Sequence, residues 1–221
     1  MPIKKNDFIE IDFVGKVKDS GQVFDLTREE DAKKHNVHNP KMKYKPLKIC
    51  VGQGHLVKGL EDFLIGKEEN KSYAVDLPPE QAFGKKDPKL MKIVSASVFK
   101  DQKIKPFPGL RVNFDNYQGT VKTVSGGRCV IDFNHPLAGH DVIYEIKGAK
   151  IISDVNEKIH TMLHGFLGHV EHDFKDDKLI LKADLPKELQ KPITDKLKEV
   201  IPEIKDVSYE KPVEKKATTA K

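Results

Sequence analysis

The chain has 221 residues, 38% of them hydrophobic and 33% charged, with a net charge of +5. This balance is typical of a globular protein with a charged surface, and no apolar run reaches the roughly 18 residues of a membrane span. The positive charge is almost wholly lysine interspersed with acidic residues, whereas nucleic-acid readers use arginine forks and clustered basic faces. We therefore expect neither a nucleic-acid partner nor a membrane.

The N-terminus and the cysteines indicate a compartment. The first residues, MPIKKND, lack the apolar stretch of a signal peptide. Cys50 and Cys129 lie far apart and neither belongs to a CxxC pair, so we interpret both as buried reduced thiols. Together these features predict a cytoplasmic protein.

The first 88 residues predict short strands around a short helix. Residues 8–17 alternate, with Ile9, Ile11 and Phe13 on one face, which indicates a half-buried strand. Further elements expected here are a helical turn at 29–34, a strand at 47–51, a helix at 57–65 and a strand at 73–77.

The pattern changes at residues 89–133. Short alternating runs, IVSASVF, LRVNFDNYQGTVKTV and RCVIDF, are joined by turns rich in glycine and proline. Such evenly spaced strands predict a small antiparallel barrel or sheet. A long strand follows at 142–152, so the small sheet reads as a domain inserted into a host domain.

The C-terminal part alternates between helix and strand. We expect helices at 156–167 and 187–200, strands at 178–183 and 205–209, and a disordered tail at 211–221. Both helices carry apolar residues at three- and four-residue spacing, so each has an apolar face that something must cover.

Sequence motifs for cofactor or nucleophile chemistry fail throughout the chain. Gly52-Gln53-Gly54 with Gly59 does not match GxGxxG, and Gly66-Lys67 is followed by Glu68 rather than Ser or Thr. Four histidines, His160, His164, His169 and His172, are spaced as metal ligands can be, although exposed histidines of a helix and loop explain them as well. We expect no cofactor and assign no metal ligand.

One ordered set of segments carries a family resemblance. The segments are FD at 24–25, PL at 46–47, GQGHLVKGLE at 52–61, PEQAFG at 79–84 and NHPLAG at 134–139. In this order and spacing they resemble an FKBP-type peptidyl-prolyl cis/trans isomerase of the SlyD-like branch, over residues 1–152. The excursion at 28–45 and the C-terminal unit are similar to those of long archaeal FKBPs.

The resemblance implies an α+β fold with four parts. An FKBP half-barrel, an antiparallel sheet wrapped on a short helix, would comprise residues 1–88 and 134–152. Residues 89–133 would form a small all-β insert-in-flap domain that acts as a chaperone. A C-terminal α/β domain, helix-strand-helix-strand, would follow at 153–210, with the tail at 211–221.

The resemblance also implies an apolar pocket in which prolyl bonds isomerise. Its catalytic residues would be Asp25, Phe83 and Tyr144, and Asp25 would be its charged group. Its substrate-binding residues would be Phe13, Phe24, Leu47, Ile49, Leu56, Val57, Leu60 and Leu137. Taken singly, each apolar residue is better explained by core packing, but as an ordered set with PEQAFG and NHPLAG they favour the pocket.

Two positions depart from the family pattern. Relatives often carry tyrosine where this chain has Phe13 and Phe83, and the hydroxyl at the second position often donates to a substrate or inhibitor carbonyl. Because one neutral hydrogen bond contributes roughly 0.5–1.5 kcal/mol, we expect weaker macrolide binding and modestly reduced turnover. Tyr144 stands where relatives often have phenylalanine.

The expected partners are unfolded or partly folded proteins, with a homodimer formed through the C-terminal domain. Two alternatives for that domain stay open, a second client-binding surface and packing against its own FKBP domain. The alternative to an isomerase with chaperone activity is a holdase whose pocket is degenerate at Phe13 and Phe83.

Overall fold

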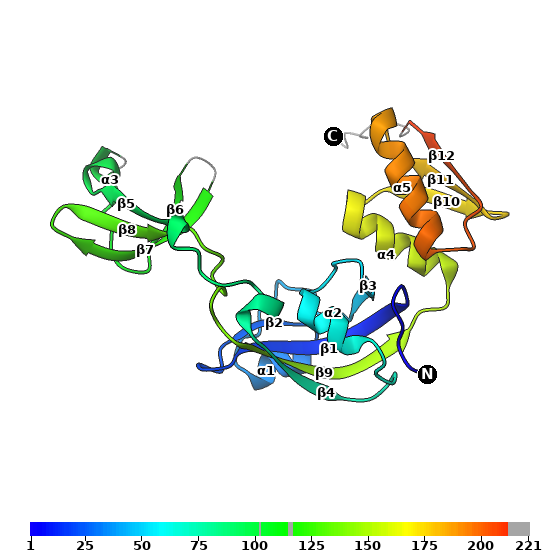
Figure 1. The fold of residues 1–221 in the computed structure, drawn as a ribbon, viewed down its shortest axis with the longest axis horizontal. Helices are drawn as coiled ribbons and strands as arrows, with labels where there is room; N and C mark the ends of the chain where they lie inside the picture. The colour runs from blue at the N-terminus through cyan, green and yellow to red at the C-terminus, as the bar shows by residue number, and fades with distance from the viewer. Residues whose placement is uncertain (102, 115–116, 212–221) are drawn as a thin grey trace, which may run out of the picture. The chain divides into compact units, whose positions relative to one another are not determined.

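The computed structural model describes residues 1–101, 103–114 and 117–211, which form two compact units (Figure 1). The first unit comprises Met1–Gly15, Asp25–Val75 and the chain from Tyr144 onward, and the second comprises Lys16–Phe24 and Asp76–Ile143. The two units are described separately below.

A five-stranded sheet is formed by the host part of the chain. Its strands are β1 (Phe8–Val17), β2 (Val23–Leu26), β3 (Leu47–Cys50), β4 (Tyr73–Leu77) and β9 (Val142–Ile151). The order is β2-β1-β9-β4, and β3 pairs antiparallel with β1. The accompanying helices are α1 (Glu29–Lys34), α2 (Lys58–Leu64) and the 3-10 turns η1 (Pro79–Gln81) and η2 (Pro88–Leu90).

Strand β1 is more deeply buried than a half-buried strand. Ile9, Ile11 and Phe13 are buried on one face as expected, but Phe8 and Val14 of the opposite face are buried too. The expectation of one covered face was therefore wrong. Phe8 is covered because it belongs to a core that includes the C-terminal part of the chain.

The C-terminal part contains one strand more than the sequence analysis gave. Its elements are α4 (Val155–Leu167), β10 (Glu171–Lys175), β11 (Lys178–Lys182), α5 (Lys187–Val200) and β12 (Asp206–Glu210), with strand order β10-β11-β12. Strand β10 was not predicted because Phe174 is the only apolar residue in EHDFK, so the segment shows no alternation of apolar and polar residues. The expected tail lies outside the described residues, except for Lys211.

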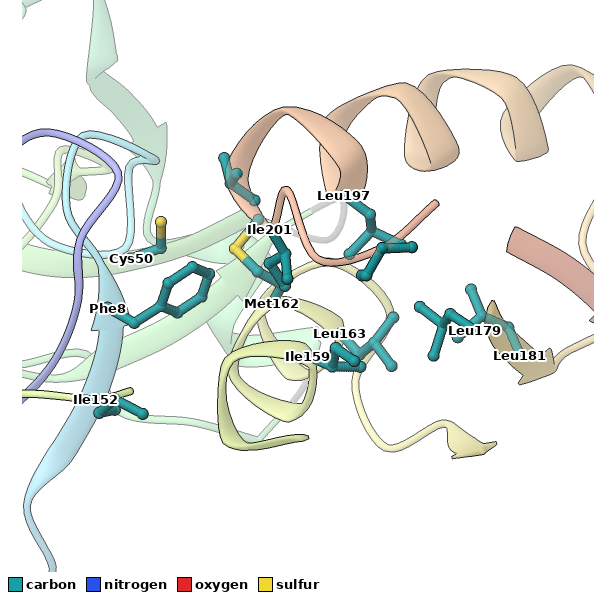
Figure 2. Packing of buried hydrophobic residues seen from close by; sticks show 12 residues of the cluster. Phe8, Cys50, Ile152, Ile159, Met162, Leu163, Leu179, Leu181, Leu197 and Ile201 are labelled. Carbon is teal, nitrogen blue, oxygen red and sulfur yellow. The ribbon is translucent and has the colours of Figure 1, made fainter. Parts of the chain in front are cut away.

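The C-terminal helices share one hydrophobic core with the five-stranded sheet. Phe8 of β1 and Cys50 of β3 face Met162 and Ile201 in this core (Figure 2). The core also buries the apolar residues of α4, β11 and α5, which are Ile159, Leu163, Leu179, Leu181, Leu197 and Val200. Packing against the chain's own N-terminal part, one of the open alternatives for the C-terminal unit, thus covers most of both apolar faces.

The insert is a four-stranded antiparallel sheet in the second unit. Its elements are β5 (Met91–Ser95), α3 (Ser97–Asp101), β6 (Arg111–Phe114), β7 (Tyr117–Ser125) and β8 (Arg128–Asp132), with strand order β5-β8-β7-β6. Its core contains Phe99, Val121 and Ile131, all fully buried. A Cβ at position 119 would lie 2.7–2.8 Å from the side chains of Ile131 and Phe133, so the close packing there requires Gly119.

The run IVSASVF is only partly a strand. Residues 97–99 begin helix α3 instead of continuing β5. The Ala96 N–H still bonds across to the Gly127 carbonyl, and at the next residue the Ser95 hydroxyl accepts a hydrogen bond from the Ser97 N–H, where the helix begins. The turn places Phe99 in the insert's core.

Candidate active site

Two aromatic rings and a carboxylate form the centre of the candidate site in the first unit. Phe13 of β1 and Tyr144 of β9 are 2% and 4% exposed, and their rings meet edge to face with centroids 5.6 Å apart. Burial raises the pKa of the Tyr144 hydroxyl, and the nearby Asp25 carboxylate raises it further. This phenol therefore stays neutral and serves as an uncharged polar group.

Asp25, in β2, is a weakly hydrated carboxylate. Desolvation raises its pKa above the ordinary value, and a hydrogen bond with the Leu26 backbone partly offsets that rise. The residue as a whole is exposed, so the partly desolvated carboxylate is accessible to a substrate. A partly desolvated charge interacts more strongly with a substrate dipole than it would in water.

Thr27 was missed by the sequence analysis and fixes the position of Phe13. Its hydroxyl oxygen accepts from the Phe13 N–H at 3.0 Å and donates to the Asp12 carboxylate at 2.7 Å. The Thr27 N–H bonds in turn to the Phe13 carbonyl at 3.2 Å. These bonds connect β1 to the end of β2, which carries Asp25.

A buried carboxylate positions the loop before α2. Glu61 is 5% exposed, and its two oxygens accept hydrogen bonds from the N–H groups of Gly54 at 3.1 Å and Leu56 at 2.9 Å. This loop leads to Val57, which stands immediately before α2. In the sequence, a glutamate seven residues past Gly54 resembles an ordinary surface residue, so only its burial identifies the role.

Leu47 and Ile49 line a cavity of about 530 Å³ between β3 and α4. The α4 residues along it are His160, Thr161, His164 and Gly165. Leu47 is 38% exposed, whereas Ile49 and Leu60 are buried in the core. Ile49 and Leu60 thus support the site by packing in the structure described here.

In the second unit, Phe24 and Phe83 form a cluster of three rings with His135. The Phe24 ring meets the Phe83 ring at 90° with centroids 5.6 Å apart. The His135 ring lies parallel to the Phe83 ring, at 2° and 4.8 Å. The backbone N–H of Leu137 donates to Nδ1 of His135 at 3.2 Å. The sequence analysis did not name His135 among the site residues, although it lies within NHPLAG.

Asn134 joins the two segments that lead into and out of the insert. Its Oδ1 accepts from the Asp87 N–H at 2.8 Å, and its Nδ2 donates to the Asp87 carbonyl at 3.1 Å and to the Asp132 carboxylate at 2.8 Å. Asp132 is itself buried, and this desolvation raises its pKa, but the hydrogen bonds from Asn134 together with the nearby Lys122 and Lys86 hold the pKa below the ordinary value. The Asn134 side-chain amide thus fixes the segment that enters the insert against the segment that leaves it.

The histidines of the C-terminal part lie close together without forming a metal site. The His160 ring is 6.2 Å from His164 and 6.4 Å from His172, measured between centroids. Within the described ranges, no three His, Cys, Asp or Glu side chains are grouped so that they could hold a metal ion. Nor does any helix described here have the length and apolar character needed to cross a membrane.

Comparison with known families gives two matches that overlap along the chain. Residues 1–100 match the family model of FKBP-type peptidyl-prolyl cis-trans isomerases. Residues 92–137 match the model of the FKBP26 IF domain.

Individual relatives agree with these matches. The short-type peptidyl-prolyl cis-trans isomerase of Methanocaldococcus jannaschii is 32% identical over 145 residues, which cover 66% of this chain and 91% of the relative. The FKBP-type 16 kDa isomerase of Escherichia coli K12 is 31% identical over 112 residues, 48% of this chain and 74% of the relative. The SlyD isomerase of Treponema pallidum is 32% identical over 104 residues, 45% of this chain and 58% of the relative.

Proposed function

Because the chain belongs to the FKBP-type peptidyl-prolyl cis-trans isomerases and carries an insert-in-flap domain, we propose that it catalyses prolyl isomerisation in unfolded proteins by desolvating the X-Pro bond. The barrier of about 18–20 kcal/mol arises from the partial double-bond character of the amide. In the twisted transition state this conjugation is lost, and the amide carries less charge separation. A site that removes water from the carbonyl therefore favours the transition state over the planar ground state.

The observation that carries this proposal is the buried edge-to-face pair of Phe13 and Tyr144, with the Asp25 carboxylate close enough to raise the pKa of Tyr144. The raised pKa of Asp25 itself supports the proposal. A carboxylate whose pKa is raised by desolvation reports a weakly hydrated environment, which this mechanism requires. Asp25 would polarise the substrate amide or accept a hydrogen bond from it. Phe83, with Phe24 and Leu137, would supply apolar contacts to the substrate, and Leu47, Leu56 and Val57 would do so around α2. The buried Ile49 and Leu60 would support these contacts from within the core.

A peptide isomerisation assay tests the assignment. Asp25→Ala and Phe83→Ala should each slow isomerisation of a short prolyl peptide while the circular dichroism spectrum stays that of the wild type. Lys4→Ala, an exposed substitution outside the proposed site, is the control. Rates equal to wild type in both site variants would refute the assignment.

For the insert we propose capture of unfolded chains. Ile93, Phe107 and Tyr117 are 70%, 56% and 71% exposed, and apolar surface of this kind binds apolar stretches of a client. Holding the client near the isomerase raises its effective concentration to about millimolar. We propose an isomerase domain of residues 1–88 and 134–152, an insert domain of residues 89–133 and a C-terminal domain of residues 153–210. Deletion of residues 89–133 should then reduce activity on an unfolded protein far more than activity on a short peptide.

A holdase without isomerase turnover is the alternative, supported by the absence of a hydroxyl at Phe13 and Phe83. Refolding of a proline-limited protein separates the two functions. Faster refolding at substoichiometric concentrations supports the isomerase. Suppressed aggregation with an unchanged refolding rate supports the holdase.

We also propose that the chain forms a homodimer through its C-terminal part. Phe166 and Leu189 are 43% and 51% exposed there, and β10 and β12 are the edges of their sheet. A stable interface should bury at least about 1,000 Å². Light scattering that gives a monomer at tens of micromolar would refute the dimer.

A cytoplasmic location stays a prediction from the sequence.

A further inference from the structure

His135 offers a hydrogen-bond donor beside an otherwise apolar pair of rings. Phe24 and Phe83 are half-buried and carry no polar atom, while the imidazole stacked on Phe83 is exposed. All three residues lie in the second unit. A prolyl peptide lying against these rings would present carbonyl oxygens that lose water, and an unpaired buried carbonyl is costly.

The hydrogen bonding of His135 defines which ring nitrogen can donate. Nδ1 accepts from the Leu137 N–H at 3.2 Å, so in the neutral imidazole the hydrogen is on Nε2. Among the residues that the structure describes, Nε2 has no hydrogen-bond partner. The imidazole therefore presents an accessible N–H that no described protein group uses.

The imidazole is held in place by the turn that carries it. The Ala138 N–H bonds to the His135 carbonyl at 2.9 Å, and the Gly139 N–H bonds to the Gly84 carbonyl at 2.8 Å, next to Phe83. Asn134, adjacent to His135, bonds to both neighbouring segments through Asp87 and Asp132. A donor held in this way needs little reorganisation when a substrate arrives.

We propose that the Nε2–H of His135 donates a hydrogen bond to a backbone carbonyl oxygen of the bound prolyl peptide other than that of the rotating X-Pro amide, which makes His135 a catalytic residue of this enzyme. The proposal rests on the proposed isomerase function and adds a residue to its site. The proton stays on Nε2 throughout, because the donor only holds the carbonyl while the C–N bond rotates. His135 supplies the polar contact that Phe83, which has no hydroxyl, lacks.

The test uses His135→Phe in the full chain, which keeps an aromatic ring on Phe83 but removes the donor. The value of kcat/KM for a short prolyl peptide should fall roughly 2- to 13-fold, the equivalent of one neutral hydrogen bond. Adding Phe83→Tyr, which brings a hydroxyl to the same stack, should restore much of the loss. His169→Phe, an exposed histidine of the C-terminal part, is the matched control and should have wild-type kcat/KM.

Three outcomes overturn one proposal or the other. An inactive wild type overturns the isomerase function itself. An active wild type with an equally active His135→Phe overturns the present proposal alone. A loss that Phe83→Tyr does not reduce means that the imidazole acts by packing, and it also overturns the donor role.

A measurement on the unmodified protein keeps the proposal testable if the variant does not fold. In ¹⁵N-histidine-labelled protein, saturation with a prolyl peptide should slow solvent exchange of the His135 Nε2–H and shift its ¹⁵N resonance. An unchanged resonance and exchange rate at saturation would overturn the proposal.

Discussion

Gly165 of α4 lies directly against His55, so that a Cβ at position 165 would be 2.9 Å from the His55 Nε2. The His55 ring cannot easily move away, because its Nδ1 accepts a hydrogen bond from the Cys50 N–H at 3.0 Å and its Nε2 is buried. Burial also lowers the pKa of His55. One missing side chain in a C-terminal helix thus allows a loop of the FKBP part to pack closely.

Gly165→Ala should therefore destabilise the protein, although alanine normally favours a helix by about 0.5–1 kcal/mol over glycine. In a His55→Ala background the contact is gone, and the same substitution should become stabilising by about that amount. Urea unfolding of the four proteins of this cycle measures both values. Stabilisation in the wild-type background would show that the contact is not restrictive.

Asp25→Asn should separate stability from activity. The pKa of Asp25 is raised in the folded protein from an ordinary value of 3.8. The folded protein therefore binds this proton more tightly than the unfolded chain does. Its contribution to stability is therefore present below the ordinary pKa and is lost as the pH rises through the raised folded pKa. Asparagine does not titrate, so the stability of Asp25→Asn relative to wild type should increase as the pH rises through that window.

The same variant should isomerise a prolyl peptide roughly tenfold or more slowly at neutral pH, the equivalent of a hydrogen bond to a charged group. Denaturant unfolding from about pH 3 to pH 7 and the peptide assay measure the two effects. A stability difference that does not change with pH would contradict the raised pKa. Full activity in the asparagine variant would contradict the role of the charge.

Cys50 should be chemically inert while the C-terminal part is packed. Burial raises the pKa of its thiol to about 12, and the residue belongs to the core shared with α4 and α5. Because the thiolate is the reactive form, modification near pH 8 should require opening of this core. In a Cys129→Ala background with no other substitution, the rate of Cys50 modification should be very low.

Phe8→Ala should raise that rate and lower the free energy of unfolding by about 3–5 kcal/mol, the usual cost of removing a buried phenylalanine ring. Phe107→Ala, which removes an exposed ring in the insert, is the matched control and should alter neither value. A modification rate that Phe8→Ala leaves unchanged would mean that Cys50 is exposed by local motion independent of this core.

The insert's exposed apolar residues should determine client capture. The double variant Ile93→Ser, Tyr117→Ser should suppress aggregation of a denatured protein less well, because the two side chains are among the most exposed large apolar groups described. Lys92→Ser, on the same strand as Ile93, is the control. Undiminished suppression by the double variant would assign capture to another surface. The measurement is turbidity during dilution of a chemically unfolded client.

The sequence alone determined the elements that depend on local periodicity. Alternation predicted β1 and β4, and the spacing of apolar residues predicted α4 and α5. The family followed from FD, PEQAFG and NHPLAG, because their order survives the insertion. Strand β10 and helix α3 were not predicted, because EHDFK has too few apolar residues and a turn interrupts IVSASVF.

Only the tertiary structure decided which distant residues meet. That Phe8 enters the C-terminal core, that Glu61 holds the Gly54 and Leu56 amides, and that His135 stacks on Phe83 are all relationships between separate segments. Periodicity reports which face of an element is apolar, but it carries no information on what covers that face. The partner is fixed by chain packing across long sequence separations, where side-chain shape and hydrogen-bond satisfaction select among many possible contacts.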